Sequence, residues 1–293
     1  MTSIISVGTR GSRLALAQTR LVIGLLKEKE RGLRFEVKPI KTQGDETHRK
    51  QLPDLTGKEA FTGTIDRALE EGEIDFAVHS LKDVPLKSSR KTVLSALPKR
   101  GAFRDVLITR QRGMRLETLP PGSCIGTSSL RRAVQLKSYR PDLKIVETHG
   151  NVSTRIEKLR RGLDAIVVAR AGLDRLGIRR IIEELSTDIM LPAAGQGCLA
   201  VSTRSDDSGM KSLVSKIDHK ETRISVTAER AFSAEFGGGC NLPVGALAQC
   251  KAGVLTLEGL VADGEIVIRD SIKGSPAEAD SLGRRLARKL AAM

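Results

Sequence analysis

The hydrophobic positions of the chain follow two alternating spacings, which predict strands and helices in turn. Short β-branched or continuous apolar runs, typical of strands buried on both faces, recur through the first two thirds of the sequence. The predicted strands cover residues 4–7, 35–40, 74–78, 105–109, 124–125, 143–146 and 165–169. Segments with apolar residues at helical spacing cover residues 12–29, 62–70, 130–138, 152–161 and 171–176. Alternation of this kind predicts an α/β architecture.

The alternation breaks at residues 98–104 and again at residues 191–197. Two breaks that flank a complete α/β segment predict a domain inserted into another, with the chain returning along residues 198–203. Residues 43–60 lack periodicity and are crowded with charge. A loop of that length in a compact domain is typical of a functional lid or of a mobile segment.

The last part of the chain has a different pattern. A helix is predicted over residues 221–235, followed by a glycine-rich loop. Alternating strands 254–261 and 265–273 come next, joined by Asp263-Gly264, a dipeptide typical of hairpins. A final helix over residues 278–292 completes a smaller unit that mixes helices with an antiparallel sheet.

Composition narrows the possible partners. The 293 residues include 49 Lys+Arg against 35 Asp+Glu, a formal net charge of +14. This excess indicates an anionic partner, either nucleic acid, an anionic membrane surface, or metabolites with several carboxylates or phosphates. Only 2% of residues are aromatic and none is Trp, which argues against the stacking platforms that bind single-stranded nucleic acid.

Cysteine and histidine spacing gives no support for a metal site. The residues in question are Cys124, Cys198, Cys240 and Cys250, with His48, His79, His149 and His219. They lie far apart and form no ligand pair of the kind that zinc sites use. The chain starts without a signal-like segment and contains no apolar run long enough to span a membrane, so we expect a soluble cytosolic protein.

Residues 126–132 read Gly-Thr-Ser-Ser-Leu-Arg-Arg and connect a predicted strand to a predicted helix. A turn of this kind presents free backbone N–H groups at the positive end of a helix, and arginine forks suit carboxylate or phosphate. The stretch therefore fits an anion-binding turn. An ordinary serine cap followed by solvated arginines fits the same seven residues equally well.

Residues 79–85 read His-Ser-Leu-Lys-Asp-Val-Pro and follow the apolar strand 74–78. Ligands of open α/β sheets bind beyond the carboxyl ends of strands, so Lys82 and Asp83 lie where a reacting group would be. On this motif alone, a solvated Lys-Asp pair in a loop is the more common arrangement. Arg10 and Arg155 also lie at or near the start of predicted helices, and we expect these turns to converge on one cleft that binds a ligand with several carboxylates.

Cys240 follows three consecutive glycines and precedes Asn241-Leu242-Pro243. Glycines permit a backbone that presents a thiol to a neighbouring cleft, which makes Cys240 a candidate for covalent chemistry. A small buried residue under a tight turn is the commoner role of a free cysteine, and the pattern alone leaves both interpretations open.

Seven stretches of the chain together resemble one enzyme family. They read TRGSRLALAQ (9–18), HSLKDVP (79–85), GTSSLRR (126–132), GNVSTR (150–155), AGLDRLG (171–177), LPAAGQG (191–197) and GGGCNLP (237–243). In this order they resemble the hydroxymethylbilane synthase, or porphobilinogen deaminase, family. Seven motifs in register are far more specific than any one of them.

The resemblance implies a fold, a reaction and a cofactor. Two periplasmic-binding-protein-like α/β domains flank a cleft, and a smaller C-terminal α/β domain with a short antiparallel sheet follows. The domains would span residues 1–98 with 191–217, then 99–190, then 218–293. Members of the family join four porphobilinogen molecules head to tail with loss of ammonia. The product grows on a dipyrromethane cofactor that the enzyme builds from its own substrate and holds through a thioether.

The resemblance also implies residue roles. Cys240 matches the thioether anchor, and Asp83 matches the catalytic carboxylate beside the pyrrole nitrogens as positive charge develops. Contacts to the cofactor are implied for Lys82, Thr127, Ser128, Ser129, Arg131, Arg132 and Arg155. Contacts to the substrate are implied for Arg10, Ser12, Gln18, Lys58, His149, Asn151, Arg175 and Gln196, with Lys58 in the lid of residues 43–60. Each pyrrole carries an acetate and a propionate. The resemblance therefore implies that the positive net charge of the chain serves to bind these carboxylates.

His149 departs from the family, which commonly has arginine before the Gly-Asn pair. A histidine is only partly charged near neutral pH, which weakens the expectation of carboxylate binding there. Arg170, at the end of a predicted strand, is a candidate to compensate.

Two other functions share some of these features. A solute-binding or ligand-sensing module uses the same bilobal scaffold, and the fold alone does not separate it from an enzyme. Asp83 and Cys240 within their motifs favour the enzyme, whereas nucleic-acid binding is motivated by charge alone. We therefore expect a monomeric cytosolic transferase that acts on porphobilinogen, with no metal, no nucleic acid and no membrane among its partners.

Overall fold

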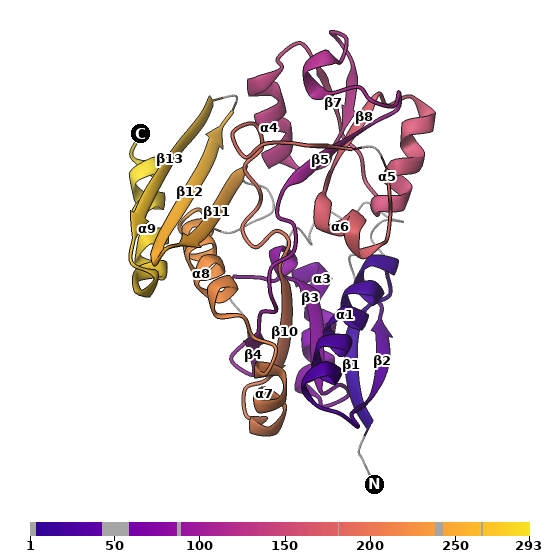
Figure 1. Ribbon diagram of the computed structural model, residues 1–293, viewed down its shortest axis with the longest axis vertical. Coiled ribbons are helices and arrows are strands. Elements are labelled where there is room, and N and C mark those ends of the chain that lie inside the picture. The colour runs from indigo at the N-terminus through magenta and orange to yellow at the C-terminus, as the bar shows by residue number, and fades with distance from the viewer. Residues whose placement is uncertain (1–3, 43–58, 87–88, 181, 238–242, 265) are drawn as a thin grey trace. The chain divides into compact units, whose positions relative to one another are not determined.

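The computed structural model describes residues 4–42, 59–86, 89–180, 182–237, 243–264 and 266–293, which form two compact units (Figure 1). One unit comprises Met1–Gly101 and Cys198–Arg223, and the other comprises Ala102–Gly197 and Ile224–Met293. The three-domain division expected from the sequence stays a prediction. Lys58, Cys240 and residues 43–58 of the expected lid lie outside the described residues.

A five-stranded sheet forms the centre of the first unit, in the order β2-β1-β3-β10-β4. Its strands are β1 (Ile4–Arg10), β2 (Arg34–Ile40), β3 (Phe76–Ser80), β4 (Thr92–Ala96) and β10 (Leu199–Arg204). The first three run parallel, with α1 (Arg13–Lys29) and α3 (Glu59–Glu70) between them in sequence, and β10 is antiparallel to both of its neighbours. The carboxyl ends of β1 and β3 therefore lie at the same edge of the sheet.

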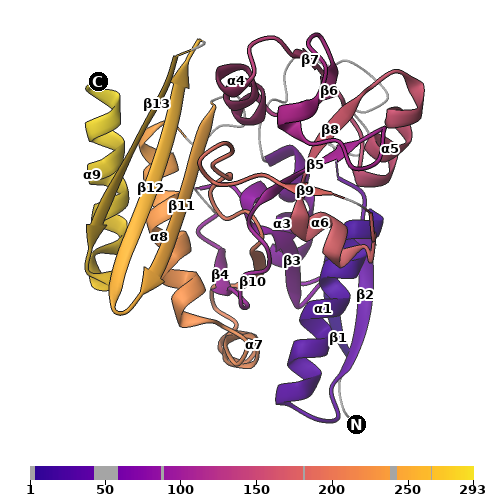
Figure 2. The same cartoon turned by 45° about the horizontal axis from the view of Figure 1, so that its top comes forward.

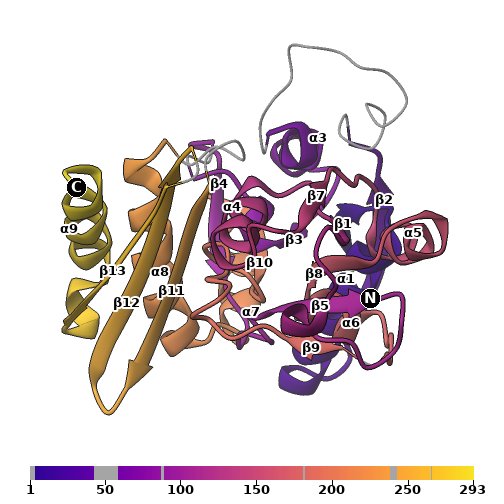
Figure 3. The ribbon, with the colours of Figure 1, turned by 90° about the horizontal axis from the view of Figure 1, so that it is seen from above.

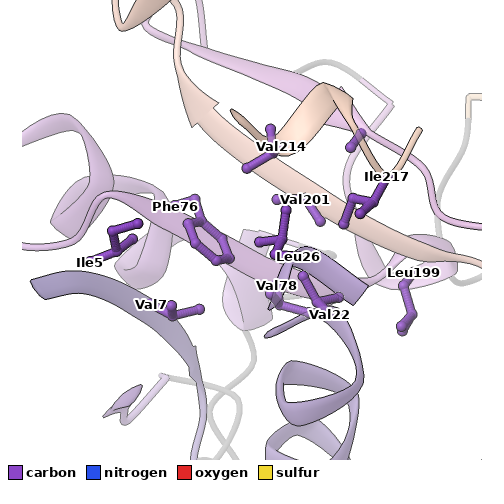
Figure 4. Packing of buried hydrophobic residues seen from close by; sticks show 11 residues of the cluster. Ile5, Val7, Val22, Leu26, Phe76, Val78, Leu199, Val201, Val214 and Ile217 are labelled. Atoms are coloured by element: carbon purple, nitrogen blue, oxygen red, sulfur yellow. The ribbon is translucent and has the colours of Figure 1, made fainter. Parts of the chain in front are cut away.

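Helices cover both faces of this sheet, because successive strand residues point to opposite sides. One face packs against α1 and α7 (Ser208–Ser215). Figure 4 shows the core on that face, which contains Ile5, Val7, Val22, Leu26, Phe76, Val78, Leu199, Val201, Val214 and Ile217. Ala77, between Phe76 and Val78, packs instead with Ile65 and Leu69 of α3.

The second unit contains a five-stranded sheet of the same plan, in the order β7-β6-β8-β5-β9. Its strands are β5 (Asp105–Thr109), β6 (Cys124–Gly126), β7 (Lys144–Val146), β8 (Ala165–Ala169) and β9 (Glu183–Glu184). Helices α4 (Leu130–Tyr139), α5 (Val152–Lys158) and α6 (Arg170–Arg175) follow its parallel strands β6, β7 and β8. Each sheet has a strand that runs antiparallel to both of its neighbours. In both units, this strand is the first one along the chain after the chain crosses over from the other unit.

A three-stranded antiparallel sheet completes the second unit, with β11 (Val244–Lys251), β12 (Val254–Asp263) and β13 (Ile266–Gly274) in chain order. The hairpin predicted at Asp263-Gly264 is confirmed. Helices α8 (Lys220–Glu235) and α9 (Ala279–Ala291) pack on one face, where Phe232 and Leu286 both approach Gly259. Figures 2 and 3 show α9 beside this sheet. The predicted fold class, α/β with a small antiparallel C-terminal sheet, is confirmed.

Candidate functional site

A pocket lies at the carboxyl edge of the first sheet. The end of β1, the first turns of α1 and the end of β3 with the 3₁₀ turn Leu81–Asp83 contribute its walls. Four predicted site residues, Arg10, Ser12, Gln18 and Asp83, line it together. The other lining residues are Leu14, Ala15, Thr62, Val78, His79 and Ser80. The structure therefore gathers residues that the sequence places on three separate elements.

Two hydrogen bonds fix the α1 side of this pocket. The Ser12 hydroxyl caps α1 by accepting from the Ala15 N–H at 3.2 Å, so the helix begins directly after β1. The buried Gln18 amide bonds to the Ser80 hydroxyl at 2.9 Å, which ties α1 to the end of β3. Ser12 and Gln18 are thus held in place before any ligand arrives.

Asp83 lies on the turn that follows β3. The Leu81 N–H donates to the Cys198 carbonyl at 3.1 Å, and the Val84 N–H closes the turn on the Leu81 carbonyl at 3.0 Å. Val84 is extended, as a residue before proline should be, so no helix continues from the turn. The Asp83 side chain is partly exposed within the pocket, and Lys82 precedes it on the same turn.

His79 is a pocket residue to which the sequence analysis gave no role. Its side chain is only 6% exposed, and its Nε2 atom has no hydrogen-bond partner among the described residues. Burial and the charge of Arg10 lower the pKa of His79 to about 4. The only signal in the sequence was the position of His79 as the first residue of the HSLKDVP motif, directly after an apolar strand.

In the second unit, Asp105 is the centre of a buried charge cluster. It begins β5, and its carboxylate accepts from Arg131 Nη2 at 2.8 Å, Arg132 Nη2 at 2.7 Å and Gln196 Nε2 at 3.0 Å. Burial alone would raise the pKa of Asp105, but the two guanidiniums outweigh it and lower that pKa to about 2. The sequence pattern did not predict a role for Asp105, because this residue is simply the first one of the predicted strand 105–109.

The cluster contradicts one of the two interpretations of residues 126–132, an ordinary serine cap followed by solvated arginines; anion binding by this turn stays a prediction. Arg131 and Arg132 are each only 5% exposed, so neither is a solvated arginine. The Ser129 side chain makes no capping bond to α4. Arg131 Nη1 also donates to the Leu191 carbonyl at 2.5 Å, while its buried Nε has no hydrogen-bond partner among the described residues. Two guanidiniums share one carboxylate, which leaves one positive charge in excess.

Arg155 extends this basic region. Its Nε donates to the Gly150 carbonyl at 2.8 Å and its Nη2 to the Ser128 hydroxyl at 2.9 Å. No carboxylate binds Arg155 within the described part of the chain. Burial and the nearby charge of Arg132 lower the pKa of Arg155 to about 10, which still leaves it charged at neutral pH. An anionic ligand beside Arg155 would offset the repulsion between the two guanidiniums.

Other predicted residues make contacts within the second unit. The buried Thr127 hydroxyl accepts from the Ser129 N–H at 3.2 Å. The Asn151 side chain caps α5 by accepting from the Thr154 N–H at 2.9 Å. Arg175 Nη2 donates to the Gly197 carbonyl at 2.5 Å. These contacts position the turns, and a ligand role for Thr127, Ser129, Asn151 and Arg175 stays a prediction.

His149 lies on the surface of the second unit. Its side chain is 61% exposed, and its Nε2 atom is 3.0 Å from Glu147 Oε1. Arg170, the candidate to compensate for the missing arginine, already binds Asp174 at 2.7 Å and Glu184 at 2.8 Å. Arg170 is therefore already paired with two carboxylates, so the structure does not support the idea that it replaces the arginine that the family has at position 149.

The described residues contain no group of three or more His, Cys, Asp or Glu side chains that could hold a metal ion. Over those same residues, no helix has the length and apolarity needed to cross a membrane. Polar groups instead gather at the carboxyl edges of α/β sheets, where such folds bind small ligands. The fold and its pocket define an α/β protein with arginine and hydroxyl side chains at the sheet edges where such folds bind ligands.

Comparison with known proteins identifies the particular family. Residues 5–212 match the family model described as porphobilinogen deaminase, dipyromethane cofactor binding domain. Residues 223–292 match porphobilinogen deaminase, C-terminal domain. The porphobilinogen deaminase of Pelotomaculum thermopropionicum is 46% identical over 98% of this chain and 93% of its own length. The porphobilinogen deaminase of a Roseiflexus species is 45% identical over 99% of this chain and 96% of its own length. The chain belongs to the porphobilinogen deaminase family.

Solved structures of lower similarity include solute-binding proteins. An ancestral cationic amino acid solute binding protein aligns with a TM-score of 0.46 at 16% identity, covering 72% of this chain and 86% of its own. The second substrate binding domain of a putative amino acid ABC transporter from Streptococcus pneumoniae aligns with a TM-score of 0.46 at 11% identity, covering 80% and 96%.

Proposed function

We propose that this protein is a transferase of tetrapyrrole biosynthesis, which joins porphobilinogen molecules head to tail, with loss of ammonia, into the linear tetrapyrrole hydroxymethylbilane. The observation that carries the proposal is the pocket that unites Asp83 with Arg10, Ser12 and Gln18 in a chain of this family. A carboxylate and a guanidinium in one pocket suit a ring whose nitrogen gains positive charge and whose arms are carboxylates.

Asp83 is the proposed catalytic residue. When ammonia leaves the substrate, positive charge spreads onto the pyrrole nitrogen, and a fixed carboxylate stabilises that charge without reorganising. The turn that carries Asp83 is held at Leu81 and Val84 by backbone hydrogen bonds, which fix the backbone from which the carboxylate projects. An asparagine at this position would offer a hydrogen bond but no charge.

Dipyrromethane is the proposed covalent cofactor, with Cys240 as its thioether anchor. When bound, it supplies the primer to which substrate rings are added. The residues of the second unit fit a group that carries several carboxylates. Arg155 has no carboxylate partner within the described chain, and the Asp105 cluster has one guanidinium in excess. The proposed carboxylate contacts are Lys82, Thr127, Ser128, Ser129, Arg131, Arg132 and Arg155.

We also propose that the protein acts in the cytoplasm as a monomer. Cys124, Cys198 and Cys250 are free thiols, which is typical of proteins in a reducing compartment. Light scattering coupled to size-exclusion chromatography, and fractionation of the source cells, test these two properties.

The intact mass of the purified protein tests anchor and cofactor together. We expect wild type to carry the added mass of a dipyrromethane and to give a coloured product with Ehrlich's reagent. Cys240→Ala should show the plain polypeptide mass, whereas Cys124→Ala, the same change at a cysteine that is a free thiol in the structure, should keep the addition. An unmodified wild-type protein that also leaves porphobilinogen unconsumed would support a solute-binding protein instead.

The Asp83→Asn variant tests the catalytic assignment. Because the substitution keeps the shape and removes the charge, we expect kcat to fall by a factor of about 100 to 1,000 with the fold intact. Steady-state kinetics and circular dichroism provide the readouts, and Asp75→Asn, away from the pocket, serves as the matched control. Product formation near the wild-type rate in Asp83→Asn would remove Asp83 from its proposed role.

A further inference from the structure

The pocket of the first unit contains a buried polar atom that the reaction described above does not use. His79 lies on β3 next to Val78 and Ser80, which also line the pocket, and it is 6% exposed. Its Nε2 atom has no hydrogen-bond partner among the described residues. Leaving such a group unsatisfied lowers the stability of the folded protein, so a partner that arrives with a ligand would explain why the group is there.

The protonation state of His79 limits what that partner is. Burial and the charge of Arg10 lower the pKa of the imidazole to about 4, so the ring is neutral at pH 7. A neutral imidazole carries one N–H donor and one bare acceptor nitrogen. Because Arg10 is close enough to influence the ring, a cation is disfavoured beside them, whereas an anion there would meet a guanidinium and an imidazole N–H.

We propose that His79 is a substrate-binding residue whose Nε2–H donates a hydrogen bond to one carboxylate arm of porphobilinogen, at the arm whose charge Arg10 balances. This inference rests on the proposed function and adds a residue to ring recognition. Asp83 lines the same pocket and supplies an acceptor for the pyrrole N–H. The pocket then offers donors to the acidic arm and an acceptor to the ring nitrogen.

Two substitutions in the holoenzyme separate binding from packing. His79→Phe keeps a flat ring without polar atoms, and His79→Gln keeps an N–H of similar reach. We expect His79→Phe to raise KM for porphobilinogen about tenfold, a loss of about 1.4 kcal/mol, with kcat changed less than threefold. His79→Gln should raise KM less than threefold. The Tm of His79→Phe should equal or exceed that of wild type, since an unpaired buried polar group has been removed.

His219 offers a matched control in the same unit. Its Nδ1 atom is 3.0 Å from the Thr222 hydroxyl and accepts from the Thr222 N–H at 3.2 Å, so this histidine is already satisfied. His219→Phe should therefore lower Tm and leave KM unchanged, the opposite of the result expected at His79. If the phenyl ring at position 79 prevents folding, His79→Met, which is apolar and flexible, takes its place.

Substrate analogues identify the arm. A pyrrole with both acidic arms but no aminomethyl group competes with substrate without reacting, and His79→Phe should raise its inhibition constant about tenfold. An analogue that lacks the arm bound by His79 should bind wild type and variant equally. An unchanged KM in a folded His79→Phe or His79→Met protein, or an equal loss for every analogue, overturns the inference. Failure of wild type to consume porphobilinogen would instead overturn the proposed function.

Discussion

Arg131 and Arg132 share a single carboxylate, and this sharing determines what each residue contributes. Asp105 is fully buried, and the two guanidiniums that it binds are 5% exposed. A buried ion pair gains little over an apolar pair of the same shape, because desolvation offsets the attraction. Removing one member of a buried ion pair is costly, because the other member is left as a buried charge without a partner. Asp105 is therefore a positioning residue for the proposed cofactor contacts.

Asp105→Asn should lower the free energy of unfolding by about 3–5 kcal/mol, because two guanidiniums lose their shared anion. Urea unfolding at pH 7 measures the change. Asp280→Asn is the control, since the Arg284–Asp280 pair is 45% and 58% exposed and such a surface pair contributes little to stability. A loss at position 105 no larger than at position 280 would contradict a structural role for the cluster.

Asp66 on α3 gives a pH-dependent prediction. Burial, opposed by a hydrogen bond from Thr62, raises the pKa of Asp66 from 3.8 to about 6. The folded state then binds the proton more tightly than the unfolded state, so this group lowers stability as pH rises from about 4 to 6. Asp66→Asn should unfold at a higher temperature than wild type at pH 7, with the gain lost below pH 4. Thermal unfolding from pH 3.5 to 7 measures it, and an equal gain at every pH would be inconsistent with titration of Asp66.

At the scale of elements, α8 holds several segments of the second unit together. Glu229 is fully buried, and its carboxylate accepts from the Gly195 N–H at 2.7 Å and from the Ala248 N–H of β11 at 2.8 Å. Gly195 neighbours Gln196, which binds Asp105. The helix thus connects the three-stranded sheet to the segment that completes the arginine cluster.

Helix α9 approaches α8 so closely that only glycine fits at position 283. A Cβ atom there would lie 2.4 Å from the Ala228 carbonyl oxygen and 2.8 Å from the Phe232 nitrogen, both of them backbone atoms. Gly283→Ala should lower the free energy of unfolding by about 1–3 kcal/mol or more, because the two helices must separate.

Gly24→Ala is the matched control for this substitution. Gly24 lies on the exposed side of α1, and nothing lies within 4 Å of an added Cβ atom. Alanine there should stabilise the protein by about 0.5–1 kcal/mol. Chemical unfolding of the two variants should therefore give changes of opposite sign, and a stabilised Gly283→Ala protein would refute the close helix contact.

At the scale of the whole molecule, the net charge of +14 suits a substrate and a product that carry several carboxylates. The two five-stranded sheets share one strand order, so each unit presents the carboxyl ends of parallel strands at one edge. Predicted site residues lie at those edges in both units, which is where a shared topology places its binding groups.

Electrostatic recognition of the acidic arms predicts a salt dependence. The Debye length shortens from about 30 Å at 0.01 M to about 8 Å at 0.15 M ionic strength. KM for porphobilinogen should rise several-fold over this range, with kcat changed much less. Steady-state kinetics in sodium chloride measure it, and an uncharged osmolyte at equal osmolality is the control. A KM that does not change with ionic strength would argue against long-range electrostatic attraction as the source of substrate binding.

Much of the fold was predictable from the chain because the spacing of apolar residues is a local property. The parallel strands, their helices, the Asp263-Gly264 hairpin and the family motifs all appeared in short windows of sequence. The strands β9 and β4 were not predicted. β9 contains only two residues, too few to show a periodic pattern, and β4 lies beside polar residues, which hide its apolar pattern.

The architecture, the family and the residue types at the proposed sites were predictable from the amino-acid sequence, since each depends on short patterns. The partners of those residues were not, because they depend on how the chain folds. Asp105 meets Arg131 and Arg132, and Gln18 meets Ser80, because strand order brings distant segments to one edge. The burial of His79 beside Arg10 also depends on the tertiary structure, because the exposure of a side chain and the electric field at it are set by the groups that pack around it.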